Sequence, residues 1–264
     1  MDVTFIERTN ERRFDPGYRG DVFVWDIDKT YLDTRFSSLR GLLAIPFELA
    51  IDKRALPGTV PLLRGLRHGA GDESAIAPIY FISGSPKHLR GIVERKMTLD
   101  GVQFDGITFK DQLGLLKARR PKGITEQVGY KLKALLLYRR EHPAGARYSL
   151  FGDDVERDLD SFLLFGEVCA GLRGPALRAR LESMGVHGDD VSEAASLADT
   201  LPIEPDPVER VFINEVKGGR IKTSDPRVLA APTFLEHARA LRALGKIRDR
   251  DVDAVALEVA ARAR

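Results

Sequence analysis

Short apolar runs alternate with helix-like segments along most of the chain. The apolar runs lie at residues 22–25, 78–82, 107–109, 148–151 and 168–172. The segments between them, whose apolar residues recur three and four positions apart, lie at residues 39–52, 57–67, 87–97, 127–140 and 156–165. A strand buried on both faces is a continuous apolar run, whereas an amphipathic helix shows the wider spacing. The alternation predicts βαβ units and an α/β fold with a mainly parallel sheet covered by helices on both faces.

The last quarter of the chain has a different pattern. Residues 201–207, LPIEPDP, place three prolines in seven positions, which is typical of a boundary. We therefore expect a main domain over residues 1–200 and an extension over residues 201–264. In the extension, residues 208–216, 233–244 and 249–263 have helical spacing, and KGGRIKTSDPR between the first two is typical of a loop. The pattern predicts a C-terminal helical extension that packs against the main domain.

The composition is that of an ordinary soluble domain. The chain has 264 residues, of which 43% are hydrophobic and 30% charged, enough to bury a sizeable core. No apolar run reaches the about 18 residues that a membrane-spanning helix needs, and the first residues lack the apolar core of a secretory signal. The single cysteine, Cys169, excludes an internal disulfide or a cysteine metal cluster. We expect a cytoplasmic protein without a transmembrane segment.

Charge is spread unevenly along the chain. The formal net charge is only +2, but residues 110–140 carry nine lysines and arginines against two acids. That segment has a net charge of +7, which leaves −5 for the remainder. A basic face beside an acidic site is the field expected around an anionic substrate, although an ordinary solvated surface has the same composition.

Polar side chains follow three of the apolar runs directly, and a lysine lies in the helix before one of them. These residues are Asp26 and Asp28 with Thr30 in VFVWDIDKTYLDT, Ser83 and Gly84 in YFISGSP, Lys131 in GYKLKALL, and Asp153 and Asp158 in YSLFGDDVERD. Because the carboxyl ends of parallel strands meet at one edge of a sheet, where ligands bind in open α/β folds, we expect these groups to converge on one site.

This order of motifs resembles the haloacid dehalogenase superfamily of phosphotransferases. By that resemblance, Asp26 corresponds to the nucleophile, Asp28 to the general acid and base, Thr30 to the threonine of the first motif, Ser83 to the hydroxyl of the second, Lys131 to the lysine of the third, and Asp153 with Asp158 to the acids of the fourth. The resemblance implies a Rossmann-like sheet with little or no cap and a magnesium-dependent phosphatase. It also implies metal ligation by Asp26, Asp28 through its backbone carbonyl, Asp153 and Asp158, and phosphoryl binding by Thr30, Ser83, Gly84 and Lys131.

The chemistry of these residue types fits the same reaction. The Asp26 carboxylate can attack phosphorus and form an aspartyl-phosphate, which splits one difficult displacement into two easier ones. Asp28, two positions later, can protonate the leaving oxygen and then deprotonate water. Four crowded carboxylates are unfavourable without a cation, and Mg²⁺ binds carboxylate and phosphate oxygens. We therefore expect Mg²⁺ as the cofactor.

Less specific interpretations stay open for several of these residues. Acids at strand ends also cap helices, and Ser83 also suits an ordinary turn. Lys133 or Lys122 are alternatives to Lys131. The neighbouring Asp154 either flanks the metal or caps a helix that begins near residue 155. The five histidines show no ligand spacing and are expected in loops or at the surface.

Within the superfamily, residues 20–172 are most similar to the phosphatidate phosphatase family typified by the yeast actin-patch protein and its bacterial relatives. The segments LPGTVPLLRGL, APIYFISGSPKHLRGIVERK and GYKLKALLLYRREHPAGARYSLFGDDVERD carry that similarity. The family commonly has asparagine in place of Gly84, an acid in place of Lys29, and serine and glycine in place of Asp154 and Val155. The resemblance implies a phosphorylated substrate, with phosphatidate as one option.

The spacing of the motifs bears on the substrate. About fifty residues separate the first and second motifs, enough for two helices but not for a lid domain. An open site suits a phosphate on a large or membrane-held molecule, since small metabolites usually need closure. Residues 41–51, GLLAIPFELAI, have two interpretations. They contact a lipid surface, as in a peripheral membrane protein, or they form a helix that covers the sheet, which we favour.

Two other functions are alternatives to a phosphatidate phosphatase. One is a phosphatase of nucleic-acid ends or phosphoproteins, of which nucleic acid is the less favoured substrate, and the other is a non-enzymatic scaffold.

Overall fold

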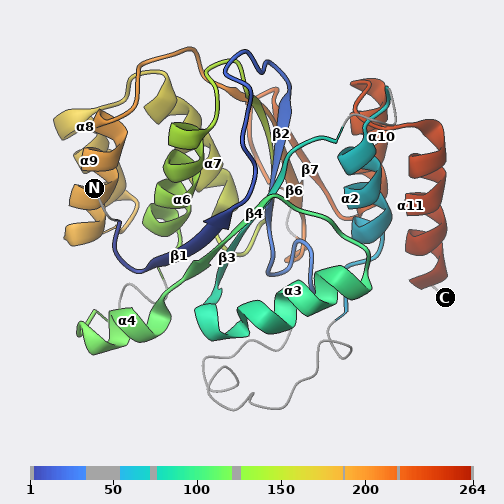
Figure 1. Cartoon of the computed structure of the whole chain (residues 1–264), viewed down its shortest axis with the longest axis horizontal. Coiled ribbons are helices and arrows are strands. Elements are labelled where there is room, and N and C mark those ends of the chain that lie inside the picture. Colours follow the sequence, from blue (N-terminus) through green and yellow to red (C-terminus); the bar gives the residue numbers. More distant parts are fainter. Residues whose placement is uncertain are drawn as a thin grey trace.

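The computed structural model describes residues 3–33, 54–71, 76–120, 126–186, 188–218 and 221–262. It has three layers, with a twisted sheet between two layers of helices (Figure 1). Some of the expected features lie outside the described residues. They are the helix expected at residues 39–52, the segment 41–51 expected to contact lipid or cover the sheet, and Lys122.

The sheet has seven strands in the order β1-β4-β3-β2-β5-β6-β7. They are β1 (Ile6–Asn10), β2 (Asp21–Asp26), β3 (Ile79–Pro86), β4 (Gly106–Lys110), β5 (Arg147–Asp153), β6 (Val208–Asn214) and β7 (Val228–Ala231). Strand β1 pairs antiparallel with β4 at one edge, and every other neighbouring pair is parallel. The prediction of a mainly parallel α/β sheet is confirmed.

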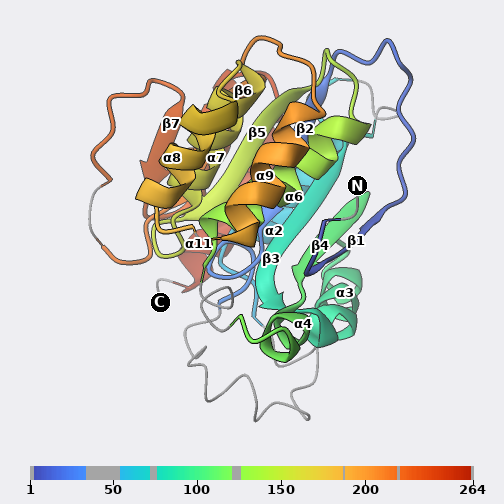
Figure 2. The same cartoon turned by 90° about the vertical axis from the view of Figure 1, so that its left-hand side faces the viewer.

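Helices cover both faces of the sheet. One face carries α6 (Val128–Glu141), α7 (Asp158–Cys169), α8 (Gly174–Ser183) and α9 (Asp189–Asp199), which Figure 2 shows in front of the sheet. The other face carries α2 (Thr59–His68), α3 (Arg90–Leu99), α10 (Phe234–Ala243) and α11 (Asp249–Arg262). The 3-10 helix η2 (Lys87–Leu89) precedes α3, and α4 (Gln112–Lys117) follows β4.

Alternation along β2 divides the core into two buried clusters. Val22 and Val24 pack in the cluster with α6 and α7, whereas Phe23 and Trp25 pack in the cluster with α2 and α10. Successive side chains of a strand point to opposite faces, so Asp26 points to the same face as Val22 and Val24. That is the face that α6 covers.

Two predicted elements are wrong. Residues 168–172 are not a strand, because α7 continues to Cys169 and a turn follows. A short apolar run of this kind does not distinguish a strand from the end of a buried helix. Residues 208–216 are not helical, because Val208–Asn214 is β6 and pairs with β5.

The C-terminal extension is therefore not only helical. Strands β6 and β7 continue the sheet, while α10 and α11 bear out the two helices expected near the end of the chain. The sequence pattern also predicts α2, α3, α6 and α7 but misses β1, α4, α8, α9 and β7. Among the described residues, no helix is both long and apolar enough to span a bilayer.

Candidate functional site

The turn after β2 presents two acids at the carboxyl edge of the sheet. Asp26 is the last residue of β2, and Asp28 follows two positions later; both are buried. Between Asp28 and Leu32 the chain folds back, with the backbone N–H of Lys29 donating to the carbonyl of Leu32 at 2.9 Å. Lys29 has φ of 62°, a left-handed conformation that is uncommon for a residue with a side chain. Such strained positions concentrate at functional sites, and this one directly follows Asp28.

Two serines from β3 hold the side chain of Asp28. The hydroxyls of Ser83 and Ser85 both donate to Oδ2 of Asp28, at 3.0 and 2.8 Å. The backbone N–H of Ser85 donates in turn to the Ser83 hydroxyl at 3.0 Å. Burial raises the pKa of Asp28, the Glu156 carboxylate adds to the rise, and the two hydroxyls oppose it. Asp28 is therefore positioned and biased to carry a proton, as a general acid requires.

Lys131 of α6 reaches the end of β2. Its Nζ lies 2.8 Å from Oδ1 of Asp26 and 3.3 Å from Oε2 of Glu156, and it also contacts Oδ1 of Asp158. Burial lowers the pKa of Lys131, but Asp158 and Asp26 outweigh that effect and hold the pKa well above its usual range. The ammonium group therefore stays charged beside Asp26.

The alternative lysine has other partners. Lys133 lies two residues after Lys131 on α6 and forms ion pairs with Asp190 at 2.8 Å and Glu193 at 2.7 Å, both on α9. This places Lys131, and not Lys133, at the acid cluster.

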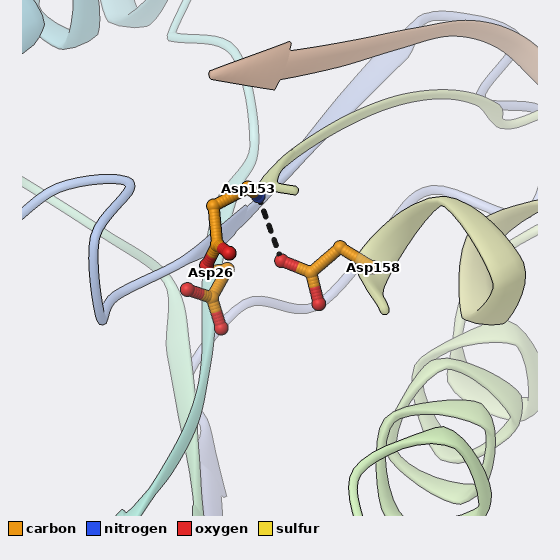
Figure 3. A group of neighbouring side chains, drawn as sticks. All are labelled: Asp26, Asp153 and Asp158. Carbon is orange, nitrogen blue, oxygen red and sulfur yellow. Dashed lines mark hydrogen bonds between the residues drawn. The ribbon is translucent and has the colours of Figure 1, made fainter. Parts of the chain in front are cut away.

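The third acid of the cluster, Asp153, ends β5 next to Asp26. Figure 3 shows the Asp26 and Asp153 carboxylates side by side, with Asp158 facing them from the first turn of α7. The backbone N–H of Asp153 donates to Oδ2 of Asp158 at 3.0 Å. A Cβ on Gly152 would lie 2.3 Å from that oxygen, so a side chain at position 152 would push α7 away. Glycine here is what allows Asp158 to approach the strand.

Oxygen atoms of Asp26, Asp153 and Asp158 lie within 4.8 Å of one another, an arrangement able to hold a metal ion. Oδ1 of Asp153 accepts from the backbone N–H groups of Val155 and, at 3.0 Å, Glu156. Oδ2 of Asp153 and Oδ2 of Asp26 are buried and accept no hydrogen bond from the described residues. A buried carboxylate oxygen without a donor is costly, so these two atoms fit a cation. Both oxygens of Asp158, in contrast, already have partners.

The charges of the site also favour a cation. Five carboxyl groups, those of Asp26, Asp28, Asp153, Glu156 and Asp158, surround two ammonium groups, those of Lys29 and Lys131. Full ionisation would leave a net charge of −3. Burial raises the pKa of Asp26 well above its usual range and that of Asp153 to about 7, and in both cases neighbouring acids contribute. A hard divalent ion that prefers oxygen ligands would compensate most of this charge.

Two residues of the site were not expected from the sequence. Glu156 bridges the two ammonium groups, with Oε1 at 2.9 Å from Nζ of Lys29. Burial raises the pKa of Glu156, but Lys131 and Lys29 outweigh it and lower the pKa below its ordinary value. Asn214 ends β6 beside Asp153, and its Nδ2 donates to the carbonyl of Lys29 at 3.0 Å. Asn214 is a polar residue at the end of an apolar run, which is the signal that also identifies Asp26. It becomes visible once residues 208–214 are assigned as a strand.

Three further residues have their own surroundings. Thr30 is fully buried, and its hydroxyl has no hydrogen-bond partner in the part of the chain that the structure describes. Gly84 accepts from the side-chain amide of Gln112 at 2.7 Å, and a Cβ there would require Gln127 to move. Asp154 accepts from the backbone N–H groups of residues 216 and 217, at 2.9 and 3.2 Å. It fixes the loop after β6, a role that differs from both the metal contact and the helix cap expected for it.

Comparison of the chain with protein-family models, with curated proteins and with solved structures finds no match. The site itself must therefore carry any assignment of function.

Proposed function

We propose that this chain is a magnesium-dependent phosphomonoester hydrolase that works through an aspartyl-phosphate on Asp26, as in the haloacid dehalogenase superfamily. One observation supports this most: the Asp26 carboxylate has Lys131 at 2.8 Å from Oδ1, its Oδ2 is buried and accepts no hydrogen bond from the described residues, and the carboxylate lies beside that of Asp153. A nucleophilic carboxylate needs a charge partner that favours its ionised form and one oxygen that the metal does not hold. For Asp26, Lys131 opposes the rise in pKa that burial causes, and Oδ1 would be the attacking oxygen while Oδ2 holds the ion.

The proposed reaction has two chemical steps, and Asp26 and Asp28 act in both. In the first, an Asp26 oxygen bonds to phosphorus as the bond from phosphorus to the leaving oxygen breaks, and Asp28 gives its proton to that oxygen. In the second, the ionised Asp28 takes a proton from water, whose oxygen bonds to phosphorus and displaces the Asp26 carboxylate. Inorganic phosphate leaves, and both acids return to their starting states. The raised pKa of Asp28 suits the acid role, because burial and the Glu156 carboxylate favour its protonated form.

The remaining residues hold and compensate charge. Asp26 and Asp153 would hold the ion through their free oxygens, together with the backbone carbonyl of Asp28, and the bound ion would draw off negative charge on the phosphoryl oxygens. Asp158 positions Lys131 and the backbone of Asp153. We assign Thr30, Ser83, Gly84 and Lys131 to the phosphoryl group, by the same family resemblance.

The basic segment does not favour nucleic acid as the substrate. Four of its nine basic side chains are buried: Lys110, Lys131, Lys133 and Arg139. Lys133 pairs with acids of α9, and Arg139 pairs with Glu204. The segment is therefore not a continuous basic surface, which phosphate-backbone binding requires.

Release of phosphate from phenyl phosphate tests the proposal. We expect turnover by the wild-type protein with Mg²⁺, none after chelation, and a loss of at least about 10³-fold in Asp26→Asn. Asp160→Asn is the matched control, because Asp160 lies on α7, pairs with Arg157 and has a side chain that is 43% exposed. Equal turnover in wild type and Asp26→Asn would remove the proposed nucleophile.

A further inference from the structure

A cavity of about 520 Å³ opens at Lys29 and Asn214, two residues of the candidate site. Its wall includes Lys29 from the turn after β2, Leu56 before α2, Asn214 and Val216 at the end of β6, and Val259 from α11. Four parts of the chain that are distant in sequence therefore enclose one space. The C-terminal helices, which the sequence pattern predicts only to pack against the main domain, form part of its wall.

Two of the lining residues belong to the site as well. Lys29 contacts Glu156, which in turn contacts Lys131 beside the proposed nucleophile. Asn214 lies opposite Asp153 in the pairing of β6 with β5, and it bonds to the carbonyl of Lys29. The cavity and the acid cluster are thus connected through Lys29 and Asn214.

Packing fixes the far wall. Gly58 precedes α2 with φ of 89°, and a Cβ on it would lie 3.0 Å from Val255, 3.1 Å from Val259 and 3.3 Å from Phe234. The start of α2 therefore lies directly against α10 and α11. Phe234 is buried, and its ring stacks on Trp25 of β2 with centroids 5.9 Å apart. The wall that carries Val259 is part of the core, which preforms the cavity.

The lining selects a class of occupant. The volume falls within the range of about 300–1,000 Å³ typical of sites for small molecules. Leu56, Val216 and Val259 provide apolar surface, while Lys29 and Arg262 add cationic groups and Asp33 and Glu215 add acidic ones. Long acyl chains packed against these charged groups would desolvate them at a cost, whereas a ring with polar substituents satisfies both kinds of wall.

We infer that this cavity receives the alcohol part of a small phosphomonoester, a ring-bearing group of about nucleoside size with polar substituents. The inference rests on the proposed function and names its substrate class. It assigns the C-terminal helices to leaving-group recognition, so residues far from the acids set which phosphomonoester is hydrolysed.

Val216→Trp tests the cavity from the loop after β6. Val216 is 40% exposed, so a larger side chain there enters the cavity without replacing core. We expect kcat/KM for adenosine 5′-monophosphate to fall at least about tenfold, and kcat/KM for methyl phosphate to stay within about twofold, because only the first leaving group needs the cavity. Val259→Phe, which fills the cavity from the opposite wall, should give the same pattern. Leu257→Trp is the control, because Leu257 is on the same helix but 73% exposed and outside the cavity.

Calorimetric titration with adenosine gives a second readout that needs no turnover. We expect the wild-type protein and Leu257→Trp to bind adenosine, and Val216→Trp to bind it at least about tenfold more weakly. Three results would each overturn the inference. They are an equal fall of kcat/KM for both phosphate esters in Val216→Trp, absence of adenosine binding by the wild type, and a preference of the wild type for micellar dioctanoyl phosphatidate over adenosine 5′-monophosphate. Absence of turnover of every ester would instead overturn the proposed function, while adenosine binding that depends on Val216 would still support the cavity.

Discussion

Nζ of Lys131 lies 2.8 Å from Oδ1 of Asp26, in a place where both side chains are almost fully buried. The two residues are 105 positions apart, and they meet because the parity of β2 turns Asp26 toward the face that α6 covers. Lys131 opposes the rise in the pKa of Asp26 that burial and the neighbouring acids cause, and so favours the ionised carboxylate that a nucleophile needs. The pair therefore links the fold of the sheet directly to the proposed chemistry.

Replacement of Lys131 should affect stability and activity together, whereas replacement of Lys133 should affect stability alone. In Lys131→Met, the acids of the cluster lose their buried cation, and we expect the free energy of unfolding to fall by about 3–5 kcal/mol and phosphatase activity to vanish. Lys133→Met breaks comparable buried pairs with Asp190 and Glu193. Urea unfolding and phosphate release on both variants check this. Activity lost to the same degree in both folded variants would contradict a specific role for Lys131.

Metal binding should depend on Asp153 and not on its neighbour. Mg²⁺ that binds only the folded state raises the unfolding free energy, by about 2.7 kcal/mol at 100 times its dissociation constant. We expect Asp153→Asn to abolish that increase, because it removes an oxygen proposed to hold the ion. Asp154→Asn should keep it, since Asp154 bonds to the loop at residues 216 and 217. Thermal unfolding with and without Mg²⁺ measures the effect, and an equal increase in both variants would exclude Asp153 as a ligand.

Asp28→Asn should slow the reaction without preventing formation of the intermediate. The amide cannot deprotonate water, so we expect kcat to fall by about 10²–10⁴-fold and phosphoenzyme to accumulate. For activated leaving groups such as p-nitrophenol, which need little protonation, formation of the phosphoenzyme should remain fast. Rapid-quench measurement of bound phosphoryl groups separates the two steps. A variant that turns over at the wild-type rate would assign the acid and base to another residue.

Acid should destabilise the protein through a buried histidine of α10. Burial lowers the pKa of His237 to about 4, below its ordinary value of 6.5. Between these values the unfolded chain binds more protons than the folded chain, so stability falls as the pH decreases from about 6.5 to 4. His237→Phe should therefore lose about 2 kcal/mol less than the wild type between pH 7 and pH 5, as measured by urea unfolding. His68→Phe, at an exposed position of α2, serves as the control and should follow the wild type.

His142 should contribute in the same direction, since burial lowers its pKa to about 3. Some acid sensitivity is thus expected to persist in His237→Phe. An unchanged pH dependence in that variant would show that His237 is not buried in its neutral form. Both histidines are buried among aromatic rings, so the expectation that histidines occupy loops or the surface is wrong for them.

Local patterns were enough to predict Asp26, Asp28, Ser83 and Asp153 at the site. Each acid or serine follows an apolar run, and parallel strands bring such positions to one edge of the sheet. The order of the motifs then distinguished Lys131 from a surface lysine by resemblance alone. The contact of Lys131 with Asp26 supplies the geometric reason that the pattern lacked.

Other features depend on contacts that no local pattern encodes. Glu156 lies in the turn before α7 and joins the site only because Lys29 and Lys131 converge on it. The segment VERVFIN resembles a helix when taken alone, but its pairing with β5 buries it as a strand. The positive charge of residues 110–140 suggested a surface, yet Lys133 and Arg139 turn inward to acids far along the chain. Tertiary partners decide each of these cases.

Asp26 should form a covalent bond to phosphorus, and mass spectrometry of the quenched protein detects that bond. Asp28→Asn is mixed with Mg²⁺ and p-nitrophenyl phosphate, quenched in acid within the first turnover, and digested. We predict one added phosphoryl group on the peptide that contains Asp26, lost on treatment with hydroxylamine as an acyl phosphate should be. Phosphate released without any phosphorylated peptide, or a phosphoryl group on a different residue, would exclude Asp26 as the nucleophile.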